Sequence, residues 1–135
     1  MTTTTPRRVL VVDDAATVRL YHGSVLRGAG WDVDEAANGY EALERALVQV
    51  YDLFVVDINM PRLDGYGLVR HLRSEAASSS APVIMISTEA RAGDVERAYA
   101  AGANLYLVKP VSADELVITA EVLAGARNAP RGVPV

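Results

Sequence analysis

The sequence predicts a single α/β domain, a doubly wound parallel sheet of five strands with helices on both faces. Five short apolar runs alternate with stretches whose apolar residues recur at helical spacing. Four of these runs are continuously apolar, which is typical of strands covered on both faces. The 135 residues, half of them hydrophobic, suffice for one compact core but not for two. We adopt 2-1-3-4-5, a common order for such sheets, as the expected strand order.

The first predicted elements are a buried strand and an amphipathic helix. Residues 9–12 are short, apolar and β-branched, which predicts a strand. Residues 15–29 follow with helical spacing and closing glycines, which predicts a helix. Its expected inward positions are Val18, Tyr21, Val25 and Leu26. The polar residues 1–7 are expected to be a flexible leader to a domain that spans residues 8–127.

An edge strand, a second helix and a further buried strand are expected next. Residues 31–36 alternate apolar and polar side chains, the pattern of a more exposed strand. After an Asn-Gly turn, a helix is expected to end near residue 49. Its apolar positions are Tyr40, Ala42, Leu43, Ala46, Leu47 and Val50. Residues 53–56 are continuously apolar and predict the strand that leads into Asp57.

The second half of the chain repeats this alternation. Further strands are expected over residues 83–86 and 105–108. Further helices are expected over residues 65–75, 93–101 and 112–126. Ser112 supplies an N-cap with acidic residues in the turn that follows it. Residues 128–135 lack periodicity and are expected to be a flexible tail.

Four of the five apolar runs end in polar side chains that can bind a ligand or take part in a reaction. These residues are Asp13 and Asp14, Asp57, Ser87 and Lys109. Ligands of doubly wound sheets bind outside the carboxyl ends of the strands, where the strand order reverses. With strands 1 and 3 adjacent, the three aspartates are expected to converge there.

Three converging carboxylates repel one another unless a cation lies among them. The chain has no cysteine, so it offers neither a thiolate nucleophile nor a cysteine-based metal site. Oxygen ligands favour a hard cation, and Mg²⁺ needs fewer protein carboxylates than Ca²⁺. The sequence therefore predicts a magnesium site.

A carboxylate beside such a metal can act as a nucleophile toward phosphorus. Asp57 would then form an aspartyl phosphate. The metal and the Lys109 ammonium would neutralise the transferring oxygens, and the Ser87 hydroxyl would donate a hydrogen bond to one of them.

Residues 8–127 resemble the receiver domains of two-component response regulators, and most closely the single-domain chemotaxis regulators of the CheY type. The matching features are the acidic pair Asp13-Asp14, the acceptor stretch 57–65, the hydroxyl of Ser87 and Lys109-Pro110. They occur in the order and spacing of that family, and jointly they are specific. The resemblance implies the flavodoxin-like fold with strand order 2-1-3-4-5.

By this resemblance, Asp57 is the phosphoacceptor of a histidine kinase, and the chain is not itself an enzyme, although it contributes to its own phosphorylation and dephosphorylation. Magnesium is implied to be held by Asp13, Asp14, Asp57 and the carbonyl group of Asn59, partly through water. A motor switch or a phosphotransfer protein is the implied downstream partner.

The resemblance also implies a switch. Ser87 and Tyr106 look like the pair whose rearrangement on phosphorylation remodels the surface of the fourth helix, fifth strand and fifth helix. The Lys109-Pro110 bond is expected to be cis, as in the family. Glu89 and Asn59 are residue types seen in chemotaxis regulators, which implies a short-lived phosphate, and Thr88 replaces the commoner alanine and narrows access to the acceptor.

Other functions stay open at this point. The chain could be a phosphorelay shuttle or the excised receiver of a larger regulator. A phosphatase with an aspartate nucleophile would carry a second acid where this chain has Asn59, and it would need a cap domain. A binding module that ignores phosphorylation would bind its partner equally well after Asp57→Asn.

Bulk properties limit the partners. The formal charge of −4 argues against a surface dedicated to nucleic acid. No apolar run is long enough for a bilayer, so we expect a cytoplasmic monomer. His22 and His71 lack partners at metal spacing and are expected to be ordinary surface or boundary residues. Asp64 is expected to be a turn residue and Trp31 to pack at the sheet edge.

Overall fold

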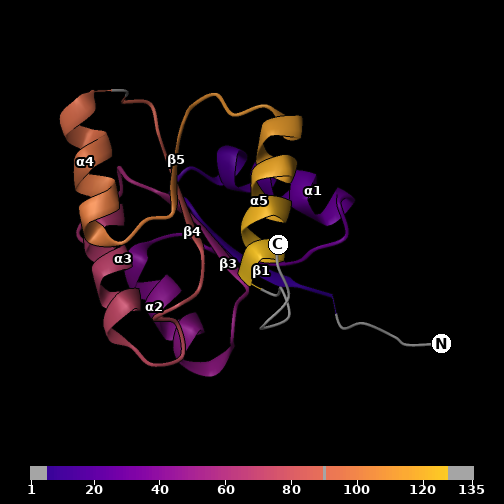
Figure 1. Ribbon diagram of the computed structural model, residues 1–135, viewed down its shortest axis with the longest axis horizontal. Coiled ribbons are helices and arrows are strands. Elements are labelled where there is room, and N and C mark those ends of the chain that lie inside the picture. The colour runs from indigo at the N-terminus through magenta and orange to yellow at the C-terminus, as the bar shows by residue number, and fades with distance from the viewer. Residues whose placement is uncertain (1–5, 90, 128–135) are drawn as a thin grey trace.

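The computed structural model describes residues 6–89 and 91–127, which form the predicted doubly wound sheet (Figure 1). Its parallel strands are β1 (Arg8–Val12), β2 (Asp32–Ala36), β3 (Leu53–Asp57), β4 (Val83–Ser87) and β5 (Leu105–Val108). They lie in the order β2-β1-β3-β4-β5, which confirms the expected order. Residues 1–5 of the predicted leader and all of the predicted tail lie outside the described residues.

Helices cover both faces of the sheet. They are α1 (Ala16–Gly28), α2 (Gly39–Val48), α3 (Gly65–Ser74), α4 (Ala92–Ala101) and α5 (Ala113–Arg127). Helices α1 and α5 pack on one face, and α2, α3 and α4 pack on the other (Figure 1). In the described part of the chain, none of them has the length and apolar character that crossing a membrane requires.

The central strands explain the continuous apolar runs. In β1, Val9 and Val11 face the layer of α1 and α5, whereas Leu10 and Val12 face the other three helices. Strands β3 and β4 alternate in the same way, so each side chain meets a helix layer whichever way it points. Strand β2 lies at the edge and keeps partly exposed residues, as its alternating pattern predicts.

The inward stripe of α1 differs from the predicted one. Tyr21 was expected to face inward but is 47% exposed, and His22 was expected near the surface but is only 3% exposed. Both expectations are wrong for one reason. His22 lies four residues before the fully buried Leu26, so the buried stripe runs through these two positions.

The predicted apolar face of α2 is also too wide. Leu47 is 72% exposed, and Tyr40 and Val50 are exposed as well. Ala42 is buried, and Leu43 and Ala46 pack against the core. A helix on an open sheet buries only the stripe that meets the sheet, and Val50 lies beyond the end of the helix.

Arg73, at the end of α3, joins two loops. Its guanidinium donates to the carbonyl oxygen of Ala81 at 2.6 Å, and to that of Gly102 at 2.8 and 3.0 Å. It also donates to Asn104 Oδ1 at 2.9 Å, which in turn accepts from the Val83 amide. Gly102 has φ 119°, and a Cβ there would lie 2.8 Å from Arg73 Cγ. The α3–β4 and α4–β5 connections are thereby fixed to each other.

Candidate functional site

The strand register brings the predicted carboxylates together. Val12 pairs with Val56, so Asp13 and Asp57 leave neighbouring strands at the same edge of the sheet. Each of Asp13, Asp14 and Asp57 offers an oxygen within 4.8 Å of the other two. Asp13 and Asp57 are buried, whereas Asp14 is exposed. The convergence expected from the strand order is therefore observed.

Lys109 supplies a positive charge to this cluster. It follows β5, whose neighbour β4 anchors it through a bond of 2.8 Å from the Lys109 amide to the Ser87 carbonyl oxygen. Its Nζ donates to Asp13 Oδ2 at 3.1 Å and to Asp57 Oδ1 at 3.0 Å. One ammonium group faces three carboxylates, so the site keeps excess negative charge.

The electrostatics of the cluster show the same excess. Burial raises the pKa of Asp57; the hydrogen bond from Lys109 lowers it, but the charges of Asp13 and Asp14 add to the rise. Burial alone would lower the pKa of Lys109, but its hydrogen bonds to Asp57 and Asp13 and their charges outweigh burial, and the pKa rises. The lysine stays charged, while ionised Asp57 needs more positive charge than the lysine provides.

The donor set fits a hard divalent cation. Three carboxylates with converging oxygens, two of them buried, supply the hard oxygen ligands that Mg²⁺ binds. Asp13, Asp14 and Asp57 could hold the ion directly or through water. The role of the Asn59 carbonyl group stays a prediction.

The loop after β3 is shaped by Gly65 and Asp64. The Gly65 amide donates to the Ile58 carbonyl oxygen at 2.9 Å, and a Cβ at Gly65 would lie 2.6 Å from the Asp57 carbonyl oxygen. Only glycine allows this approach of α3 to the acceptor strand. Asp64 caps α3 by accepting from the Gly67 amide at 2.9 Å, in keeping with its expected turn role.

Ser87 and Tyr106 are joined through Glu89. The buried Ser87 Oγ accepts from the Glu89 amide at 3.0 Å and lies 3.4 Å from Asn59 Nδ2. The hydroxyl of the half-buried Tyr106 donates to the Glu89 carbonyl oxygen. This connection through one residue was not expected from the sequence. The Lys109-Pro110 peptide bond is cis, as the resemblance implied.

His22 lines a cavity beside the carboxylates. The cavity measures about 450 Å³ and includes Thr88, Lys109 and Pro110 in its lining. Burial lowers the pKa of His22, and the charge of Asp13 opposes this shift only in part. The imidazole therefore stays neutral near neutral pH. His71 is exposed, as predicted.

In the absence of metal, the buried Asp57 makes the stability of the folded chain depend on pH. Its folded-state pKa lies above the ordinary value of 3.8, so between these two values the folded state binds more protons than the unfolded chain. Stability should then fall as pH rises through that window. In EDTA, we expect the thermal midpoint of the native chain to drop relative to Asp57→Asn as pH rises from about 4 to about 7. Parallel profiles by circular dichroism would contradict this.

Comparison with known proteins gives the family. Residues 9–121 match the response regulator receiver domain. Protein PilG of Pseudomonas aeruginosa is 36% identical over 110 residues, which cover 82% of each chain. Sensor protein EvgS of Escherichia coli is 41% identical over 108 residues, which cover 80% of this chain and 9% of that protein. The gliding motility regulatory protein of Myxococcus xanthus is 42% identical over 102 residues, which are 13% of its length.

Solved structures agree in fold. Chemotaxis protein CheY4 of Vibrio cholerae has a TM-score of 0.85 and 32% identity, over 88% of this chain and 99% of that one. The receiver domain of a Pseudomonas aeruginosa sensor histidine kinase has a TM-score of 0.83 and 31% identity, over 90% and 99%. That structure holds a magnesium ion in its active site cleft. With its fold, its aspartate cluster and the family match in agreement, this chain belongs to the response regulator receiver domains of two-component systems.

Proposed function

We propose that Asp57 accepts a phosphoryl group from a histidine kinase. Receiver domains are phosphoacceptors in signalling rather than classical enzymes. The observation that carries the proposal is the bond of 3.0 Å from Lys109 Nζ to Asp57 Oδ1 inside the aspartate cluster. A carboxylate oxygen of Asp57 attacks phosphorus, the phosphorus–nitrogen bond of the donor phosphohistidine breaks, and the imidazole leaves with the bonding electron pair.

Mg²⁺ is the proposed cofactor of this step. Asp13, Asp14 and Asp57, with the carbonyl group of Asn59, would hold it, and the magnesium ion in the cleft of the similar kinase receiver supports the choice. When bound, the ion offsets the negative charge of the transferring phosphoryl oxygens. Lys109 contributes the same kind of stabilisation from the β5 side, held by Asp13 and Asp57.

The signal would leave through Ser87, Glu89 and Tyr106. A phosphate on Asp57 gives the Ser87 hydroxyl a charged acceptor, and turning toward it breaks the bond with the Glu89 amide. The Tyr106 hydroxyl, which donates to the same residue, would lose its partner and turn inward. The surface of α4, β5 and α5 would then change. That surface exposes the apolar side chains of Tyr99, Val108, Ile118 and Val122.

We place this output in chemotaxis, in a cytoplasmic monomer. The likeness to chemotaxis protein CheY4, over nearly the whole of that chain, supports this placement. A phosphorelay is the second candidate, because similar receivers also belong to sensor protein EvgS and to sensor histidine kinases. In a relay, the partner would be a histidine phosphotransfer protein.

Capture with beryllofluoride tests the output. The beryllofluoride adduct of Asp57 mimics the acyl phosphate, and the loaded native chain should capture its downstream partner. Lys109→Ala should lose more of its partner capture, on the order of tenfold, than of its phosphate acceptance, because the ammonium that reports the phosphate to β5 is gone. Capture of a flagellar motor component supports chemotaxis, and capture of a phosphotransfer protein supports the relay. Equal capture by both proteins would contradict the role of Lys109.

A further inference from the structure

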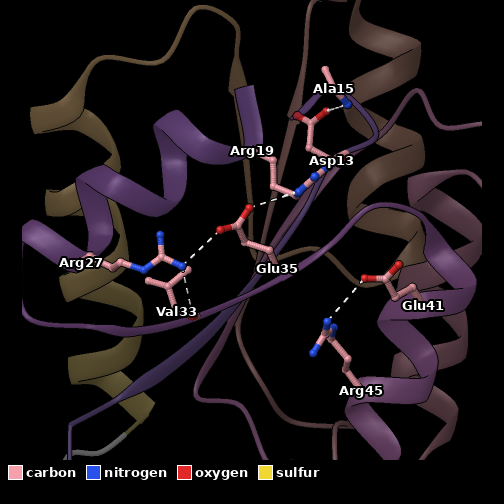
Figure 2. Close-up of polar contacts among 8 residues, drawn as sticks. All are labelled: Asp13, Ala15, Arg19, Arg27, Val33, Glu35, Glu41 and Arg45. Carbon is pink, nitrogen blue, oxygen red and sulfur yellow. Dashed lines mark hydrogen bonds and ion pairs between the residues drawn. The ribbon is translucent and has the colours of Figure 1, made fainter. Parts of the chain in front are cut away.

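Arg19 reaches back from α1 to the acidic pair. Its Nη1 donates to the carbonyl oxygen of Asp13 at 2.7 Å, and its Nε donates to Glu35 Oε1 at 3.2 Å (Figure 2). The side chain of Glu35 comes from the edge strand β2 and accepts from Arg27 at 3.1 Å with its other oxygen. Arg19 therefore lies between the Asp13-Asp14 pair and Glu35, a carboxylate that two arginines bind.

The position of Arg19 is electrostatically unfavourable for α1 taken alone. It lies in the first turn, where the helix dipole favours anions, and α1 has no acidic residue in that turn. The N-cap residue Ala15 also offers no side-chain cap. Glu35 compensates the misplaced cation, because its carboxylate forms a charge-assisted bond to the guanidinium in a partly buried setting. The arrangement therefore favours a role for Arg19 outside the helix.

The bond to the Asp13 carbonyl acts on Asp14. The carbonyl group of Asp13 and the amide of Asp14 share one planar peptide unit, so holding the carbonyl oxygen of Asp13 also holds the amide nitrogen and Cα of Asp14. Asp13 itself is also held through its amide, which donates to Ala36 at 3.2 Å, and through Oδ1, which accepts from Ala15 at 2.9 Å. Asp14 is exposed, and within the described residues its side chain has no hydrogen bond. Its position depends on this peptide plane.

Arg27 and Gly23 complete the support of Glu35. A Cβ at Gly23 would lie 3.3 Å from Arg27 Nη1 and 3.7 Å from Glu35 Oε2, so the bare helix surface leaves room for this ion pair. Glycine inside a helix costs about 1 kcal/mol relative to alanine, so the space at Gly23 comes at a cost in helix stability.

We propose that Arg19, held by Glu35, is a positioning residue that orients the Asp13-Asp14 peptide for Mg²⁺ binding. The proposal rests on the magnesium site of the proposed function and adds a residue outside it. Groups that orient metal ligands typically change affinity 10- to 100-fold when removed. The structure assigns this task to a side chain six residues after Asp13.

The direction in which Mg²⁺ affinity changes distinguishes a positioning role of Arg19 from a purely electrostatic one. Arg19→Ala removes a positive charge near the cation site, and the loss of its Coulomb repulsion would by itself tighten Mg²⁺ binding. Loss of positioning weakens it. We expect the dissociation constant for Mg²⁺, measured by calorimetry on the unphosphorylated full chain, to rise about tenfold in Arg19→Ala. The dissociation constant of Arg19→Lys should lie between those of the native chain and Arg19→Ala, because one ammonium cannot reproduce both bonds.

Two further variants complete the experiment. Glu35→Gln keeps Arg19 but weakens its anchor, so it should raise the dissociation constant by a smaller factor. Arg45→Ala is the matched control, because Arg45 forms an exposed ion pair with Glu41 on α2, away from the site (Figure 2). It should change affinity less than about twofold. All variants are compared where circular dichroism in EDTA shows them folded.

The outcomes are distinct. Equal or tighter Mg²⁺ binding by Arg19→Ala, or equal weakening by Arg45→Ala, would overturn the positioning role and leave the proposed function intact. No Mg²⁺ binding by the native chain would overturn both the positioning role and the magnesium site of the proposed function. A phosphorylation rate of Arg19→Ala that recovers at saturating Mg²⁺ would support positioning, because the acceptor itself is unchanged.

Discussion

Asp57→Asn should abolish the covalent phosphoryl adduct, both with acetyl phosphate and with the cognate kinase. The amide has nearly the same shape as the carboxylate and fits the buried site, but it lacks the negative oxygen that attacks phosphorus. Intact-mass spectrometry of the native chain should show one added phosphoryl group that the variant lacks. Loss of the adduct with an unchanged fold would assign the acceptor.

Asp64→Asn is the matched control for that experiment. Asp64 lies in the same loop and caps α3, and asparagine is an equally good N-cap residue. This variant should keep the adduct and the stability of the native chain. An adduct of the same mass on Asp57→Asn would show that another residue accepts phosphate. Unchanged capture of the partner by Asp57→Asn would favour the binding module that ignores phosphorylation.

Chelation of Mg²⁺ should stop both gain and loss of the phosphoryl group. One ammonium cannot neutralise three carboxylates and the incoming phosphoryl oxygens. If the ion contributes about 4 kcal/mol of charge stabilisation, both rates should fall on the order of a thousandfold. The rates of adduct formation and decay are measured by mass spectrometry after EDTA is added, and again after Mg²⁺ is restored.

Calcium is the control for the chelation experiment. Restoring Ca²⁺ instead of Mg²⁺ should recover little activity, because Ca²⁺ prefers more protein ligands than this cluster offers. Rates that stay unchanged in EDTA would reject a metal role in phosphotransfer. They would leave Asp57 as a metal-independent acceptor.

The parts of the fold that burial dictates could be predicted from sequence. Strands covered on both faces must be apolar throughout, so β1, β3 and β4 stand out as apolar runs rich in valine, leucine and isoleucine. A single polar residue at the end of such a run is ordinary, but the coincidence of four runs that end in Asp, Ser or Lys made Asp13, Asp57 and Lys109 recognisable. The convergence of the aspartates then followed from the adopted strand order.

The errors concern which side chains of a helix are buried, which depends on the rotation of the helix about its axis. His22 was expected to be a surface or boundary residue because it has no partners at metal spacing, yet it shares the buried stripe of Leu26, whereas Tyr21, which was expected to face inward, is exposed. Residue type at one position cannot fix that rotation. Contacts with the sheet fix it, and they depend on how α1 leaves β1.

The contact between Arg19 and Asp13 was missed for a related reason. It joins the loop after β1 to α1 and depends on Glu35 from the edge strand, so no local pattern contains it. One signal was present in the sequence. An arginine in the first turn of a predicted helix opposes the helix dipole and requires a compensating acid elsewhere.

The Arg73 contacts bear on how α4 can move. Its last turn runs into Gly102, whose carbonyl oxygen accepts twice from Arg73 on α3. In its first turn, the carbonyl oxygen of Asp94 accepts from the hydroxyl of Tyr66, which also belongs to α3, at 3.2 Å. Helix α4 is thus tied to α3 near both of its ends, so a rearrangement that moves α4 must carry α3 with it or break one of these contacts.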